Sequence, residues 1–216
     1  MTTGTLARGV TPFFSIWVRP RRTMRAIIDS NPRRLVLVLA ALSGFGSALD
    51  NASTSSIGDG NSIPVVAIVA LSAVAGSLGG ILTLYVGGFV MKWAGRPLGG
   101  RATQVEVRAA LAWSTVPLIW ALPLWIPELA LAGREMFTTA TPILAASPLR
   151  AVLLVLVVLL EVVLGIWSFV LFLKCLGEVH GFSAWKSLAA VLLSVLAIVL
   201  VALIVALPIV LVAATV

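Results

Sequence analysis

The sequence has little of what enzymes and metal proteins use in their sites. It contains one Cys, one His and one Tyr, and only 11% of its 216 residues are charged. A single cysteine, Cys175, excludes an intramolecular disulfide and a metal centre built from cysteines. A single histidine, His180, lacks the further ligands of a metal site and the nucleophile of a catalytic triad. We therefore expect a non-enzymatic protein with no catalytic residues, no cofactor and no metal.

Apolar residues dominate the chain instead. Hydrophobic residues make up 60% of the sequence, and its mean hydropathy of +1.12 is far from that of a soluble domain. A helix needs about 20 apolar residues to cross a bilayer, and five runs are close to this length or longer. The sequence predicts an all-α integral membrane protein, a bundle of five transmembrane helices in one domain over residues 35–216. The predicted spans are about 35–52, 65–91, 107–126, 149–173 and 187–214.

The basic residues predict the topology. If the chain crosses the membrane five times, all but two of its 15 Lys and Arg residues lie on one side, the exceptions being Arg134 and Arg150. Cytoplasmic loops carry such an excess, so we expect a cytoplasmic N-terminus and a C-terminus outside. The first apolar run begins only at Leu35, which predicts an uncleaved first span in place of a signal peptide.

Residues 1–34 form a basic segment in which arginines, beginning with Arg8, alternate with aromatic and aliphatic residues. We interpret the part from Pro12 to Asp29 as two short helices, separated at Pro20, that lie on the inner leaflet. Its partners are then membrane lipids with anionic headgroups, and no nucleic acid. A protein partner or a second copy of the chain remains an alternative, as does a basic tail that only follows the charge rule. The candidate lipid or partner face is Trp17, Arg19, Arg21, Arg22 and Arg25.

Local patterns mark several helix starts. Thr103 and Glu106 have the spacing of a capping box. Ser183 is a candidate cap for the last span. A cap residue followed by proline precedes three further spans, at Asn31–Pro32, Ser62–Pro64 and Ser147–Pro148.

Two spans have unusual composition. Span two carries a stripe of small residues, which allows close helix approach in lipid. We interpret the stripe as packing within the bundle, with a homodimer seam or a substrate path as alternatives. Span three contains two prolines, each of which removes a backbone hydrogen bond and predicts a helix break. The stripe is Ser72, Gly76, Gly80, Thr83 and Gly87, and the prolines are Pro117 and Pro123.

Glu161 lies near the middle of span four, where an ionised carboxylate costs at least about 2.5 kcal/mol. Helical spacing places Gly165 and Ser168 on the same face, toward the bundle. One hypothesis is a proton- or cation-coupled site. The other is a neutral carboxyl that bonds a hydroxyl or indole of a neighbouring helix, the candidates being Ser114, Thr115, Trp120 and Ser194.

Three other polar residues are expected to have local roles. We expect Asp50 and Glu128 to be solvated at the outer ends of their spans, and His180 to make a hydrogen bond within its loop. The sequence shows no pair of carboxylates at one depth, which argues against an intramembrane enzyme.

Three segments resemble the Yip domain family, polytopic proteins named for binding Ypt and Rab GTPases. These are Trp17-Val18-Arg19-Pro20, the run from Gly99-Gly100 to Ala112-Trp113-Ser114-Thr115-Val116-Pro117, and Leu176-Gly177-Glu178-Val179-His180-Gly181-Phe182-Ser183. The resemblance implies five spans, a cytoplasmic N-terminus and, for eukaryotic members, a role in Golgi and endoplasmic reticulum traffic. Those members carry an Asp-Leu-Tyr-Gly-Pro signature that this sequence lacks. Its absence favours a prokaryotic member in the inner membrane and argues against carrying over GTPase binding.

Two functions follow from these patterns. The first is a non-enzymatic protein that organises or scaffolds the membrane, or recruits partners, through its basic cytoplasmic face. The second is a small transporter, channel or lipid-moving protein that uses the proline-broken third span and Glu161.

Overall fold

The computed structural model describes residues 12–60 and 63–214, and within these ranges it contains helices and no strands. Arg8 and Ser62 therefore lie outside the described residues. The helices are α1 Pro12–Val18, α2 Pro20–Ser30, α3 Val36–Thr54, α4 Val65–Leu71, the π-helix η1 Ser72–Gly76, α5 Ser77–Gly95, η2 Arg96–Leu98, α6 Gln104–Ser114, α7 Val116–Ala121, η3 Leu122–Leu124, α8 Trp125–Ala132, η4 Gly133–Phe137, α9 Pro142–Ala146, α10 Pro148–His180 and α11 Ala184–Ala214.

Five segments of the described chain are long and apolar enough to cross a membrane, which confirms the predicted fold class. Each overlaps a predicted span, and the helices of the second, third and fourth spans run further than predicted, since polar turns extend the apolar runs. Large apolar side chains along these helices are exposed, as a surface in contact with lipid requires. The five segments are Val36–Thr54, Val65–Leu98, Gln104–Phe137, Pro148–His180 and Ala184–Ile204.

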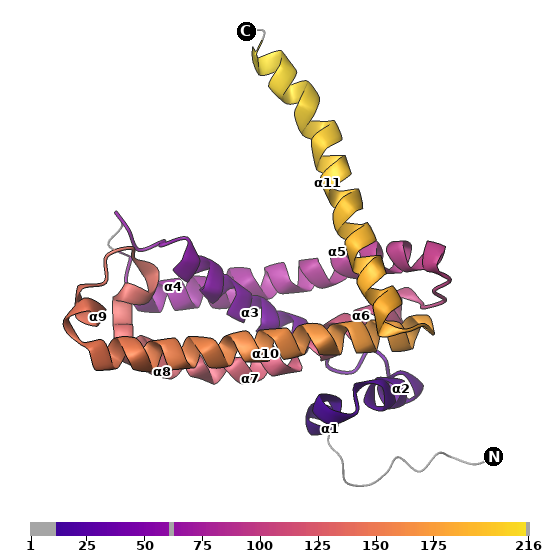
Figure 1. The fold of residues 1–216 in the computed structure, drawn as a ribbon, viewed down its shortest axis with the longest axis horizontal. Coiled ribbons are helices and arrows are strands. Elements are labelled where there is room, and N and C mark those ends of the chain that lie inside the picture. The colour runs from indigo at the N-terminus through magenta and orange to yellow at the C-terminus, as the bar shows by residue number, and fades with distance from the viewer. Residues whose placement is uncertain (1–11, 61–62, 215–216) are drawn as a thin grey trace.

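Four of the five spans pack side by side, and the fifth leaves them. Helices α3, α5 and α10 run along the long axis of the molecule with the broken third span, whereas α11 rises away at a steep angle (Figure 1). Among the described side chains of α11, the buried ones lie near its start, at Ser187, Ala190 and Ser194, where it meets α10 and α5. Further along, Ile204 is 70% exposed. The compact part of the bundle is thus built by the first four spans.

The two N-terminal helices dock on one end of this bundle, below the turn between α10 and α11 (Figure 1). Pro20 starts α2 because its missing N–H costs nothing at the first helical position. The apolar side chains Ile16, Met24 and Ile27 are at most 5% exposed and belong to the main core. Phe13 packs on Trp113 of α6, with ring centroids 5.2 Å apart. Protein, and not only lipid, therefore covers the apolar face of this segment.

The predicted helix starts had different outcomes. The capping box at Thr103 and Glu106 is present, and Ser183 accepts a hydrogen bond from the amide of Lys186. Ser147 precedes α10 but makes no side-chain cap. The start at Asn31 was wrong, because its side chain accepts from the Arg33 amide in a local turn and the helix begins only at Val36.

At the opposite end of the bundle, short elements close the structure. Glu135 accepts hydrogen bonds from the amides of Ile143 and Leu144, which stabilises the start of α9. The carboxylate of Asp59 accepts from the amide and the hydroxyl of Thr139. Polar contacts to its neighbours therefore hold α9 in place at this end of the bundle.

Candidate functional site

The small residues of the second span lie against the first. The carbonyl of Gly44 on α3 points toward Gly76, and the backbones of Gly44 and Gly80 are in direct contact. A Cβ atom on Gly80 would lie 2.7 Å from the Gly44 Cα. Ser72 is buried, Thr83 lines a cavity of about 310 Å³ beside α3, and a Cβ on Gly87 would only touch Leu111 at 3.7 Å. The small residues of this stripe thus make their contacts within the bundle.

The third span is divided where its prolines lie. Helix α6 ends at Ser114, Pro117 stands in the first turn of α7, and Pro123 lies in the 3₁₀ turn before α8. The break exposes the carbonyl of Ser114, which accepts a 2.8 Å hydrogen bond from the hydroxyl of Ser168 on α10. A side chain of the neighbouring span thus satisfies a backbone group that would otherwise be unpaired in the membrane.

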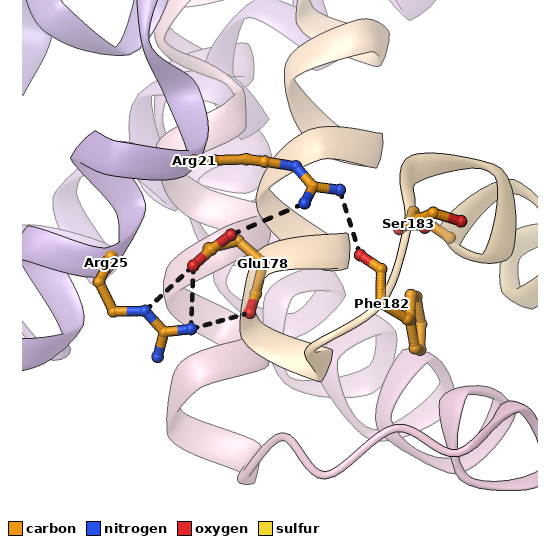
Figure 2. Close-up of polar contacts among 6 residues, drawn as sticks. Arg21, Arg25, Glu178, Phe182 and Ser183 are labelled. Atoms are coloured by element: carbon orange, nitrogen blue, oxygen red, sulfur yellow. Dashed lines mark hydrogen bonds and ion pairs between the residues drawn. The ribbon is translucent and has the colours of Figure 1, made fainter.

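A cluster of ion pairs holds α2 on the turn between α10 and α11, and we call it the arginine clamp (Figure 2). The Arg25 guanidinium contacts the Glu178 carboxylate at 2.9 Å, and Arg21 lies 3.9 Å from the same group. Arg21 also donates to the carbonyl of Phe182 at 3.1 Å. Glu178 is only 18% exposed, and the clamp joins residues 153 positions apart. It fixes the basic segment in one position on the bundle.

His180 lies beside the clamp, at the end of α10. Its ring is 2% exposed, stacks on Phe182 with centroids 5.0 Å apart, and packs on the backbone of Gly95 and Gly100. The predicted loop hydrogen bond was wrong for the ring, because neither ring nitrogen has a partner in the described structure. The backbone carbonyl of His180 instead accepts from the amide of Arg101 at 3.4 Å. The histidine joins the two loops at this end of the bundle by packing.

A basic pocket opens next to the clamp, between the start of α2 and α10. It has a volume of about 300 Å³ and is lined by Arg19, Pro20, Arg21, Arg22 and Lys174. The side chains of Arg19, Arg22 and Lys174 have no acidic partner in the described part of the chain. Trp17 is partly buried against the core, so it does not line this pocket. The basic residues of this end therefore divide into Arg21 and Arg25, which are paired in the clamp, and Arg19, Arg22 and Lys174, which line the pocket without an acidic partner.

Three carboxyl groups from three different spans meet within the bundle, and we call them the carboxyl cluster: Asp50, Glu128 and Glu161. Asp50 on α3 and Glu161 on α10 line one cavity of about 260 Å³. Glu128 on α8 is only 1% exposed, and its carboxyl interacts with those of Glu161 and Asp50. Neither oxygen of Glu128 has a hydrogen-bond partner with standard geometry. No Lys or Arg side chain contributes to the cluster among the described residues.

The carboxyl cluster corrects two expectations from the sequence. Glu128 is not a solvated boundary residue, because the helical turns after Pro123 direct it into the interface between α8 and α10. Two carboxylates do lie together, Glu128 with Glu161. Asp50 is exposed, as expected for a residue near a span end.

The hydroxyls proposed as partners of Glu161 have other acceptors. Ser114 and Thr115 donate to carbonyls of their own helix, at 2.7 and 2.8 Å. Ser194 donates to the carbonyl of Ala190. Trp120 is 49% exposed and packs on Phe14, with ring centroids 5.6 Å apart. The polar neighbour of Glu161 is another carboxyl.

Sequence reasoning missed Glu128, Glu178 and Lys174 as site residues. Glu178 lies in one of the quoted motifs, between Gly177 and Gly181, and these glycines are a signal for a turn. Glu128 and Lys174 have no such signal, because only the packing of α8 and α2 on α10 decides where their side chains go.

The helices and their apolar surfaces define a polytopic integral membrane protein. A family model describes the protein more closely: that of the Yip1 domain matches residues 14–206, nearly the whole chain. The chain therefore belongs to the Yip1 domain family, which confirms the resemblance of its three motifs. No curated protein and no solved structure matches it.

Proposed function

We propose that this Yip1 domain protein is a non-enzymatic membrane organiser that binds anionic lipid headgroups through its basic end. The observation that carries this proposal is the division of the arginines. The arginine clamp fixes α2 on the bundle, while the unpaired cations Arg19, Arg22 and Lys174 line one open pocket.

Electrostatics supports an anionic partner for this pocket. Like charges held together repel one another unless an anion neutralises them. The amino end of α2 adds the positive end of its helix dipole at the same place. Lys174 lies six residues before the end of α10, roughly 9 Å along the helix axis. Arg19, Arg22 and Lys174 therefore lie near the end of a spanning helix, at the depth that we expect for the lipid headgroups.

The same charges support the proposed orientation. Cytoplasmic leaflets carry anionic lipids and cytoplasmic loops carry the Lys and Arg excess. We accordingly place the basic end in the cytoplasm, the carboxyl terminus outside, and the protein in a prokaryotic inner membrane. A protein partner or a second copy would meet the same face.

The experiment is native mass spectrometry of the full chain purified from a membrane with both zwitterionic and anionic lipids. Each basic side chain near the surface contributes about 1 kcal/mol to binding of anionic lipid. The triple variant Arg19→Gln, Arg22→Gln, Lys174→Gln should thus bind retained anionic lipid roughly a hundredfold more weakly.

The matched control is Arg150→Gln, an exposed arginine at the other end of the bundle. It should leave the retained lipid unchanged. Equal lipid retention by wild type, triple variant and control would contradict the proposal. Arg21 and Arg25 are left intact because their substitution would also open the clamp.

The second candidate is a small transporter, channel or lipid-moving protein. The observation that favours it is the cavity of about 260 Å³ that reaches Glu161, together with the neighbouring cavity of about 310 Å³. Ser43 and Ser47 of α3 line both, so polar groups connect them. Flux of ions or lipids through reconstituted vesicles that depends on Glu161 would support this function over membrane organisation.

A further inference from the structure

The carboxyl cluster has no role in the proposed lipid binding, because none of its residues lines the basic pocket. Three acidic side chains that lie close together are unusual inside a membrane. Glu128 sits in the α8–α10 interface with 1% exposure and two oxygens without a partner. Glu161 approaches it from α10, and Asp50 from α3.

No Lys or Arg of the described chain lies close to the carboxyl cluster. On α10, Arg150 precedes Glu161 by eleven residues, roughly 16 Å along the helix, and Lys174 follows it by thirteen, roughly 20 Å. On η4, the Arg134 guanidinium donates to the carbonyl of Gly58, and Glu135 accepts from the start of α9. No described cation therefore balances two ionised carboxylates in the cluster.

Two carboxylates cannot both remain ionised there at small cost. Burial away from water disfavours each charge, and the two charges repel one another. A single proton placed between the two carboxyl groups removes one charge and supplies a donor for an unpartnered oxygen of Glu128. This arrangement satisfies the pair without a change in backbone.

We propose that Glu128 and Glu161 form a binding site for one exchangeable proton inside the bundle, and that Asp50 is the carboxyl through which this proton exchanges with water. On release, the O–H bond of the protonated carboxyl breaks, its electron pair stays on the carboxylate, and the proton passes to water in the cavity. Binding is the reverse step.

Asp50 is suited to this exchange because it is exposed and lines the same cavity as Glu161. It lies four residues before the end of α3 and is more exposed than either member of the pair. The hydroxyls of Ser43 and Ser47 on the cavity wall can bind water along the way. The cavity thus joins Glu161, one member of the pair, to the exposed Asp50.

The test is infrared spectroscopy of the full chain in lipid nanodiscs, which detects the C=O stretch of protonated carboxyl groups. Wild type should show this band at neutral pH. Glu128→Gln and Glu161→Gln should each shift it, since the remaining carboxyl then holds a proton beside an amide and no longer shares one with a second carboxylate, and the double variant should lack it. Asp50→Asn should keep the band but slow its hydrogen–deuterium exchange several-fold.

Glu106→Gln is the matched control, because glutamine preserves the capping box at the other end and should leave the band unchanged. Thermal unfolding of each variant shows that it is folded. Three results would overturn the proposal: no protonated carboxyl at neutral pH, a band that survives in the double variant, or a band that responds to sodium and not to pH. Retention of anionic lipid should be unaffected, so this result is independent of the proposed function.

Discussion

The two charged regions of this protein follow opposite rules. At the basic end, the one acidic residue of the clamp, Glu178, is paired with Arg21 and Arg25. In the carboxyl cluster, three acids meet without a cation from the described chain. The ion pairs of the clamp hold α2 on the bundle, whereas the carboxyl cluster contains Glu128 oxygens without a hydrogen-bond donor from the protein. Proteins retain such unsatisfied groups at functional sites more often than elsewhere.

The contrast also separates stability from function. Clamp residues can be predicted to stabilise the docking of α2, although exposed ion pairs contribute little each. Cluster residues can be predicted to lower stability, because taking two carboxyl groups out of water costs more than one shared hydrogen bond returns.

The largest effect should come from the scaffold that holds both regions in place. Gly80→Ala puts a Cβ 2.7 Å from the Gly44 Cα, where only backbone can move. We expect the free energy of unfolding to fall by about 3 kcal/mol, since overpacking at a backbone contact separates α3 from α5. Thermal unfolding can be followed by the reactivity of the buried thiol of Cys175.

The neighbouring glycine provides the control. A Cβ on Gly79 meets nothing within 4 Å, so Gly79→Ala should leave unfolding unchanged or raise the stability by roughly 1 kcal/mol. If the two variants unfold at the same temperature, the result would contradict a close backbone contact between α3 and α5 at Gly80.

A second, smaller effect should have the opposite sign. Glu128→Met replaces an unpartnered buried carboxyl with an apolar side chain of similar size. We expect the unfolding free energy to rise by about 2 kcal/mol, since burying the Glu128 carboxyl away from water costs more than one shared hydrogen bond to Glu161 returns. A melting temperature below that of wild type would show that the shared proton stabilises the pair by more than this burial costs.

The smallest effect should be confined to the basic end. Glu178→Gln removes the charge that both clamp arginines contact, so we expect α2 to open more often, with a loss of about 1 kcal/mol. Hydrogen exchange of the α2 amides measures this opening. Asp29 is an exposed acid on the same helix and has no ion pair or hydrogen bond in the described chain. The control Asp29→Asn should therefore leave the exchange rates unchanged. Similar exchange rates in the two variants would show that the clamp does not hold α2 on the bundle.

The elements of the fold were largely predictable, because each depends on local composition. The apolar runs marked all five spans, and the spacing of Thr103 and Glu106 marked the capping box. Where a local alternative existed, as with the turn at Asn31, the prediction failed. The apolar face of α2 was visible, but the sequence does not distinguish lipid from protein as its partner.

The contents of the sites were less predictable, because they depend on how distant segments pack. Glu161 was marked by its depth in the membrane, whereas Glu128 looked like a boundary residue until α8 was placed against α10. The clamp joins Arg25 to Glu178 across most of the chain. The departure of α11 from the bundle has no signal in its uniformly apolar sequence.

The most direct test of the account is the side of the membrane on which each end lies. Two single-cysteine variants probe the two ends of the bundle. Arg101→Cys lies in the loop at the basic end, and Thr141→Cys lies just before α9. Both positions are exposed, while the native Cys175 is buried. In intact cells, an impermeant thiol reagent should label Thr141→Cys and not Arg101→Cys, which should react only after the membrane is opened. Labelling of Arg101→Cys in intact cells would place the basic end outside and contradict the binding of inner-leaflet lipids.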